Sequence, residues 1–290
     1  MKKIHIGFLL SYDYEKLKNS IPPVYEEADK IFIAVDHENR TWSGQKYYID
    51  ESFFTWLKKF DKDNKIEIYK DDFYVPEISA IENDNRERHM LSLKMGIGNW
   101  LIQIDSDEYF LDFKKFVKEL RTYDYYLDNP EKDQIQIAAF LINMYKYTDD
   151  GLLFVKKPTR VLAATNYPSY IVARHTRQRI IYTPNILWHE TLARDEKEIE
   201  FKLKNWGHNV DVDIEKFMDK WKSVNKSNYK TMEGFFYMNP KKWRKLEFVD
   251  GKSIKEVSDN LDAKKFLPSY AYIKFKNFEQ WVKFLFRNRK

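Results

Sequence analysis

The chain has 290 residues, a mass of 35.3 kDa and a formal net charge of +5 at pH 7. Hydrophobic residues make up 43% of it and aromatic residues 17%, which excludes a disordered chain although the mean hydropathy is −0.68. The length suits one large domain with an extension, or two small domains. Because 50 cations stand against 45 anions, the balance argues against a nucleic-acid-binding protein and weakly favours an anionic partner.

The sequence contains no cysteine, so a disulfide framework, a thiolate nucleophile and a cysteine-based zinc site are excluded. This absence fits a reducing compartment, and we expect a cytoplasmic protein, with the inner face of the membrane as a further location. The apolar run at residues 4–10 is too short for a signal peptide and is followed at once by Asp13 and Glu15, so we predict a first strand there. No apolar run is long enough to cross a membrane.

The first 105 residues alternate between short apolar runs and helical patterns. We predict strands at residues 4–10, 30–35, 65–69 and 99–104, and helices at residues 14–27 (broken at Pro22-Pro23), 51–60 and 83–95. Strands that alternate with helices form parallel sheets with right-handed crossovers. The first half therefore indicates an α/β unit of the nucleotide-binding kind.

The rest of the chain predicts a more mixed architecture. We expect a helix at residues 113–122, strands at 134–144, 152–155 and 170–172, and a charged helix at 194–204. After about residue 210 the pattern becomes α-rich, with helices at 214–222, 253–260 and 277–288. We therefore predict a domain at residues 1–210 and an α-rich C-terminal extension at residues 211–290.

The most informative segment is residues 98–110, where a short apolar strand leads into Asp105-Ser106-Asp107-Glu108. Ligands of open α/β sheets bind beyond the carboxyl ends of the strands, which is where these acids would lie. Two carboxylates two residues apart can hold Mg²⁺ or Mn²⁺ and leave coordination positions for phosphate oxygens. The alternative is that these residues cap a helix that begins near Phe110.

A second candidate cluster contains His189, Glu190 and His208. Burial beside Trp188 would raise the pKa of Glu190 and make it a general base, although Glu190 can also cap the helix that follows. Either histidine could complete a metal site begun by Asp107. For His189, a structural hydrogen-bonded role is the leading interpretation.

Other polar residues are candidates for nucleotide or phosphate contacts. Asp36 ends the second predicted strand and could accept a hydrogen bond from a base or ribose, or cap a helix. Arg86 and Arg88 precede the acidic motif and could bind nucleotide or phosphate, or form solvated ion pairs. Three further arginines could neutralise a leaving diphosphate or decorate an exposed strand: Arg174, Arg177 and Arg179.

With these motifs, the chain resembles the family 2 glycosyltransferases of the GT-A fold from Ile4 to about His208. The resemblance implies a Rossmann-like mixed sheet flanked by helices. It also implies that Asp107 binds the divalent cation, that Asp105 holds ribose or metal, and that Asp36 recognises the nucleotide. Arg86 and Arg88 stand in the place of the family's Arg-containing helix. Glu190 matches the carboxylate that deprotonates the acceptor, and the family pattern favours His208 over His189 as a metal ligand.

The expected activity is inverting transfer of a sugar from a nucleoside-diphosphate sugar, UDP-linked by expectation, to a hydroxyl of a glycan or lipid-linked acceptor in surface polysaccharide synthesis. The expected cofactor is Mn²⁺ or Mg²⁺. A noncatalytic carbohydrate-binding protein on a degenerate transferase fold is the alternative from another class. A metal-dependent nuclease or nucleotidyltransferase that uses the same acids is a third hypothesis, which the charge balance does not favour.

The C-terminal part is rich in aromatic residues. They could stack on acceptor sugars or pack on the core: Trp221, Tyr229, Phe235, Phe236, Tyr237 and Trp243. Residues 278–290 are both aromatic and basic, which predicts either contact with an anionic membrane surface or an amphipathic helix docked on the domain.

Overall fold

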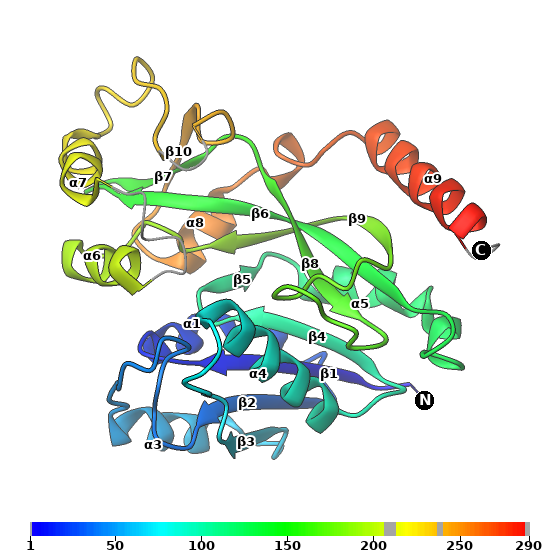
Figure 1. Ribbon diagram of the computed structural model, residues 1–290. Helices are drawn as coiled ribbons and strands as arrows, with labels where there is room; N and C mark the ends of the chain where they lie inside the picture. The colour runs from blue at the N-terminus through cyan, green and yellow to red at the C-terminus, as the bar shows by residue number, and fades with distance from the viewer. Residues whose placement is uncertain (1, 206–212, 237–239, 288–290) are drawn as a thin grey trace. The chain divides into compact units, whose positions relative to one another are not determined.

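The computed structural model describes residues 2–205, 213–236 and 240–287, which form an α/β fold with a large mixed sheet, flanking helices and a C-terminal helix (Figure 1). The chain divides into two compact units. Unit 1 comprises Met1–Ala139, Val161–Asn185 and Pro268–Lys290, and unit 2 comprises Phe140–Arg160 and Ile186–Leu267. Both units are assembled from segments that are distant in sequence, and the division near residue 210 stays a prediction.

Unit 1 is built on the parallel strands predicted from the first half of the sequence. β1 (Ile4–Leu10), β2 (Lys30–Asp36), β3 (Ile66–Asp71) and β4 (Trp100–Asp105) lie in the order β4-β1-β2-β3 and are all parallel. The central strand β1 is buried along its whole length. β8 (Thr159–Thr165) pairs with β4 in the antiparallel direction, which makes the sheet mixed. The parallel α/β prediction is confirmed.

The helices of unit 1 begin where side chains cap them. α3 (Glu51–Phe60) is capped by Asp50, and α4 (Ala80–Met95) by a reciprocal Ser79 and Glu82 capping box, three residues before the predicted start. Pro22-Pro23 breaks the first helical segment, as predicted. The remaining short helices of this unit are η1 (Tyr14–Lys16), α1 (Leu17–Ser20), α2 (Pro22–Tyr25), α5 (Phe113–Arg121) and η2 (Asp124–Leu127).

α4 packs along the parallel sheet (Figure 1). Its residues Leu91 and Met95 belong to an apolar cluster that also contains Leu9 of β1 and Leu101 of β4. Gly7 of β1 faces the same helix, and a Cβ at this position would lie 2.7 Å from the Met95 sulfur. The close approach of α4 to the sheet therefore depends on a residue without a side chain in β1.

One predicted strand is wrong, and four of the described strands were not predicted, at residues 108–110, 159–165, 179–189 and 246–250. Residues 170–172 lie in a loop, where Val172 forms only an isolated bridge with His175 and pairs with no neighbouring strand. β8 was missed because its apolar run is short, and β9 (Arg179–His189) because Pro184 interrupts its pattern. β6 (Ile135–Tyr147) and β9 contribute residues to both units.

In unit 2, β7 (Gly151–Val155) pairs with β6 and with β10 (Leu246–Asp250), both in the antiparallel direction. Trp221, Tyr229, Phe235, Phe236 and Trp243 pack in one buried core. The aromatic-rich segment is therefore largely core, which agrees with the second of the two alternatives given for it, and Tyr237 lies outside the described residues. The helices of the unit are α6 (Glu196–Asn205), α7 (Ile214–Ser223), α8 (Ile254–Asn260) and η4 (Ala263–Lys265).

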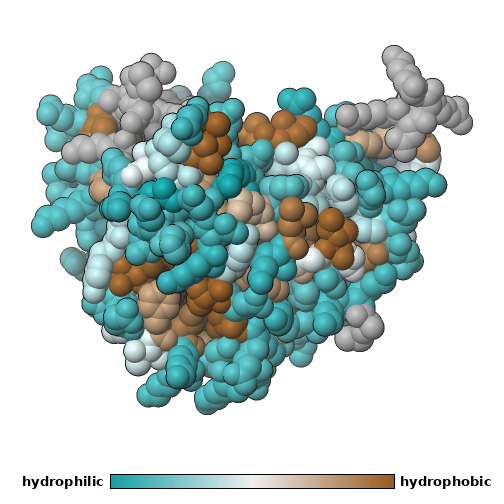
Figure 2. Space-filling model, turned by 60° about the horizontal axis from the view of Figure 1, so that its bottom comes forward, coloured by the Kyte–Doolittle hydropathy of each residue, from teal (hydrophilic) through white to brown (hydrophobic). Residues whose placement is uncertain are grey.

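α9 (Tyr270–Arg287) is longer than predicted and belongs to unit 1. No helix among the described residues has both the length and the apolar character needed to cross a bilayer. Figure 2 shows one face of the molecule, on which hydrophilic side chains predominate and apolar patches lie apart from one another.

We predict that Gly7→Ala lowers the free energy of unfolding by about 1–3 kcal/mol, because the new methyl group overpacks the contact with Leu91 and Met95. Urea denaturation measures the change. In a Met95→Ala background the same substitution should cost less, since one of the two clashing side chains is gone. Strictly additive costs in this double-mutant cycle would contradict the proposed contact.

Candidate functional site

The acidic motif forms a tight turn between two strands of unit 1. Asp105 is the last residue of β4, and Glu108 opens the short strand β5 (Glu108–Phe110). The next helix, α5, begins only at Phe113 and is capped by Asp112, which accepts a hydrogen bond from the Lys115 amide. The motif therefore does not cap a helix, and the helix-cap interpretation is wrong.

This turn lies at the carboxyl edge of the parallel strands. Asp105 is in register with Leu9 of β1, one residue before that strand ends. The Ser106 hydroxyl donates a 2.8 Å hydrogen bond to Asp13, which follows β1. The acidic turn and the loop after β1 are thus joined at the edge where ligands of open α/β sheets bind.

Two arginines hold the carboxylates of the turn. Arg174 donates two hydrogen bonds of 2.7 Å to the two oxygens of Glu108, whose side chain is 1% exposed. It also approaches Asp105 at 3.5 Å. Arg88 of α4 donates to Asp105 at 2.9 Å and to Asp84, one helical turn earlier, at 2.6 Å. The bidentate geometry and the burial give a rigid network of compensated charges.

The electrostatics of this network keep Asp105 ionised. Burial raises the pKa of Asp105, but Arg174 and Arg88 outweigh burial, and its pKa is about 2. Asp107, which is itself buried, acts in the opposite direction and raises the pKa of Asp105. Two like charges are thus placed close together on one turn, an arrangement that a cation would stabilise.

The predicted arginines have different environments. Arg88 is buried in the network, whereas Arg86 donates hydrogen bonds to the backbone carbonyls of Asp72 and Phe73 and fixes the loop after β3. Arg177 is exposed. Arg179 donates to the Tyr126 hydroxyl at 2.9 Å. Within the basic run, Arg174 contacts the acidic turn.

α4 carries two further buried carboxylates that sequence reasoning missed, Asp84 and Glu87. Burial raises the pKa of Glu87 to about 8, although the Trp42 indole donates a 2.5 Å hydrogen bond to it. Burial likewise raises the pKa of Asp84, against the effect of Arg88. The only signal in the sequence was the spacing of Asp84 and Arg88, which are four residues apart on a helix that is charged on several faces.

Asp36 ends β2 at the same edge of the sheet, but its carboxylate is already engaged. It accepts hydrogen bonds from the side chain and amide of Arg40 and from the amides of Glu38, Phe73 and Tyr74. Arg40 also pairs with Asp72. Asp36 therefore joins the loops after β2 and β3. A nucleotide could bind to its carboxylate only if it replaced some of these hydrogen-bond donors.

The candidate metal ligands fall into two sets. Asp105 and Asp107 lie on one turn, but no group of three His, Cys, Asp or Glu side chains within the described ranges is arranged to hold a metal ion. His208 lies outside the described residues. His189 belongs to unit 2, where its Nδ1 lies 3.1 Å from the Asn143 side-chain oxygen, as expected of a structural histidine.

Glu190 lies in unit 2 and lines an open hollow of about 370 Å³. Glu190 is 9% exposed. Burial of Tyr147 raises the pKa of that hydroxyl, and the charge of Glu190 raises it further. Arg194 donates from Nε to the Glu190 carbonyl at 3.0 Å. Lys146 and Trp221 line the same hollow, and the Lys146 ammonium donates to three carbonyls at the end of α7. A buried carboxylate thus faces a cavity that a hydroxyl-bearing molecule could enter.

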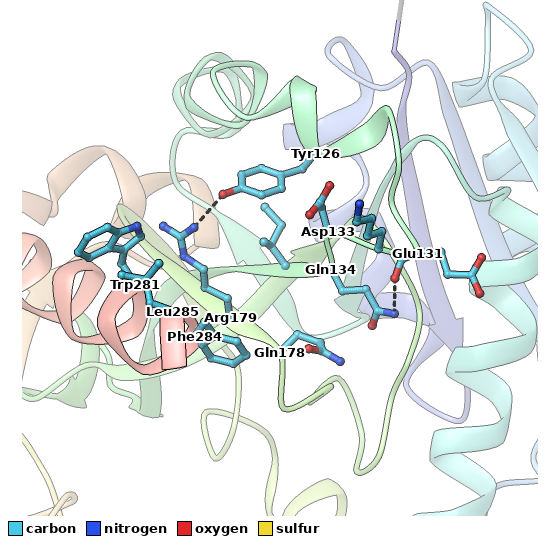
Figure 3. Close-up of a pocket in the computed structure, with 11 residues that line it drawn as sticks. Tyr126, Glu131, Asp133, Gln134, Gln178, Arg179, Trp281, Phe284 and Leu285 are labelled. Carbon is cyan, nitrogen blue, oxygen red and sulfur yellow. Dashed lines mark hydrogen bonds between the residues drawn. The ribbon is translucent and has the colours of Figure 1, made fainter. Parts of the chain in front are cut away.

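A second hollow, of about 360 Å³, lies in unit 1 at the opposite edge of the sheet from the acidic turn. It adjoins Ile135, whose amide bonds to Asn166, and the neighbouring Thr165 pairs with Leu101 at the start of β4. Figure 3 shows Arg179 reaching toward Tyr126 between this wall and α9. Because carboxylates and cations both line it, the hollow carries no strong net charge.

No protein-family model matches the chain, and no curated protein matches it significantly.

We predict that Arg174→Gln lowers the free energy of unfolding by about 3–5 kcal/mol, because Glu108 then keeps a buried charge without its bidentate partner. Urea denaturation at pH 7 measures this change. Lys114→Gln, at an exposed cation of α5, is the control and should stay within about 0.5 kcal/mol of wild type. The pair Arg174→Gln/Glu108→Gln should be more stable than Arg174→Gln alone, and a less stable pair would contradict the charge argument.

We also predict an acid-dependent contribution from Asp105. Its folded pKa of about 2 lies below the unfolded value, so ionised Asp105 stabilises the fold fully above about pH 4. That contribution, about 2 kcal/mol, is lost as the pH falls toward 2. Unfolding free energies of wild type and Asp105→Asn between pH 2 and 5 test the prediction. Equal pH dependence in the two proteins would rule it out.

Proposed function

We propose that the chain is a metal-dependent inverting glycosyltransferase with a GT-A fold, which moves a sugar from a UDP-linked donor to a hydroxyl of a glycan or lipid-linked acceptor. The observation that carries the proposal is the ionised acidic turn, Asp105 to Glu108, at the carboxyl edge of a parallel sheet between Arg88 and Arg174. Diphosphates need both cationic groups and hard oxygen ligands for their counterion, and this turn brings the two together.

In the proposed donor site, Asp105 and Asp107 would hold Mg²⁺ or Mn²⁺. The donor set fits such an ion, because two ionisable oxygen ligands repel each other on one turn and the remaining positions can take phosphate oxygens and water. When bound, the ion supplies positive charge to the departing diphosphate. Arg88 and Arg174 keep the two carboxylates oriented and add positive charge to the same edge.

Glu190 is proposed as the general base. The acceptor hydroxyl loses its proton to Glu190 while its oxygen attacks the anomeric carbon in line. The bond from that carbon to the diphosphate oxygen breaks, and the nucleoside diphosphate leaves with the electron pair, so the anomeric configuration inverts. Support comes from the position of this carboxylate, which is buried near Tyr147 and lines an open hollow that a hydroxyl-bearing acceptor could enter.

We predict that calorimetry detects binding of UDP-sugars that is at least about tenfold tighter with Mn²⁺ than without it, because a cation compensates both carboxylate and diphosphate charge. Asp107→Asn should remove most of this metal dependence. No binding of any UDP-sugar in the presence of Mn²⁺ would contradict the donor site.

Glu190→Gln should keep donor binding within a few fold but reduce transfer, or slow donor hydrolysis, by about 10²–10⁴-fold, because the general base is lost. Glu198→Gln is the matched control and should retain activity. Glu198 lines the same hollow, but it exchanges hydrogen bonds with Asp195 at the start of α6. Donor binding without turnover by the wild type would instead indicate the noncatalytic carbohydrate-binding alternative.

A further inference from the structure

α9 has two faces with different roles. On the inner face, Asn277 joins the backbone of Tyr182 in β9 by two hydrogen bonds of 2.7 and 3.0 Å, and Gln280 accepts from the Ile180 amide at 3.2 Å. Ile273, on the same face, is 5% exposed. These contacts satisfy the backbone of β9 and fix the rotation of the helix about its own axis.

The opposite face of α9 presents large apolar side chains to solvent. Phe275 and Phe278 are 62% and 60% exposed, and Leu285 is 46% exposed. At 100° per residue these positions form one stripe that is roughly opposite to Ile273 and Asn277. Large exposed apolar patches on soluble surfaces mark interaction sites, whereas single exposed rings do not.

Lysines flank the apolar stripe. Lys274 and Lys283 are exposed, and Lys274 lies 4.6 Å from the ring centre of Tyr270. The helix sequence carries four cations, at residues 274, 276, 283 and 287, against one carboxylate, Glu279. Cations beside an aromatic stripe are the composition of helices that lie on anionic membranes.

We propose that the outer face of α9 binds the surface of an anionic lipid bilayer, with Phe275, Phe278 and Leu285 entering the acyl boundary and the lysines contacting lipid phosphates. Charge complementarity favours this partner over a second copy of the chain, because two stripes placed face to face would bring like-charged lysines together. The inner-face hydrogen bonds hold the helix folded in advance, so little ordering free energy is lost on binding.

The α9 residues that line the neighbouring hollow also favour a shallow contact with the bilayer. Trp281 and Phe284 line the hollow that contains Arg179, and Figure 3 shows Trp281 beside the Arg179 side chain. Trp side chains favour the level of lipid headgroups, where an apolar ring and a polar edge are both satisfied. The described helices include none that could cross a bilayer, so the proposed contact is peripheral. This inference does not rest on the glycosyltransferase proposal.

Flotation of the full chain with vesicles tests the proposal. We expect recovery with phosphatidylcholine vesicles that contain 30% phosphatidylglycerol to exceed recovery with pure phosphatidylcholine at least about tenfold, and to fall in 0.5 M NaCl. Phe275→Ser/Phe278→Ser should reduce the partition coefficient about tenfold or more. The matched control is Tyr48→Ser/Tyr125→Ser, at two aromatic residues of similar exposure elsewhere in unit 1, and it should bind like wild type.

A second pair of variants separates charge from apolar contact. Lys274→Gln/Lys283→Gln should weaken binding to anionic vesicles several-fold, whereas Lys58→Gln/Lys59→Gln on the exposed side of α3 should not. Equal flotation of wild type and the double-phenylalanine variant would overturn the proposal. A second outcome would also overturn it: the wild type does not bind vesicles, but sedimentation shows a concentration-dependent dimer that Phe275→Ser/Phe278→Ser abolishes. Circular dichroism of each variant confirms that it is folded.

Discussion

The candidate donor site depends on the compensation of buried charge by two arginines. Glu108 is almost fully buried, and an ionised carboxylate in that position is tolerable only because Arg174 binds both of its oxygens. Arg88 of α4 donates a hydrogen bond to one oxygen of Asp105 and, with Arg174, keeps that carboxylate ionised. The position of α4 on the sheet, which Gly7 permits, therefore determines whether the acidic turn can keep its charge.

The strands and helices of the first half could be predicted because their signals are local. Alternating apolar runs and helical patterns specify β1 to β4 and the helices between them, and the carboxyl ends of parallel strands share one edge by topology. The Asp105 turn could be placed there from sequence for the same reason. The helix-cap alternative failed because Tyr109 and Phe110 continue as a short strand, so the nearest cap is Asp112.

The partners of these acids could not be predicted, because they come from distant segments. Arg174 follows the acidic turn by more than 60 residues and lies in a loop, just after the residues where a strand was expected. Asp36 looked like a ligand-binding residue because it ends a strand, yet Arg40 already occupies one of its oxygens and the amides of the loop after β3 occupy the other. Sequence spacing identifies which residues reach an edge, but the tertiary hydrogen bonds decide which of them stay available there.

Charge balance also restricts which ligands the acidic turn can accept. A bare anion that drew Arg88 or Arg174 away would leave Asp105 or Glu108 with an uncompensated buried charge, which costs several kcal/mol, on the order of 3–5. A diphosphate that carries its own divalent cation offers each arginine a new acceptor and each carboxylate a new positive neighbour. In the proposed donor site, the network would therefore favour a metal-chelated phosphate ligand over either a free metal ion or a free phosphate. That proposed selectivity would follow from the buried ion pairs, whatever sugar the ligand carries.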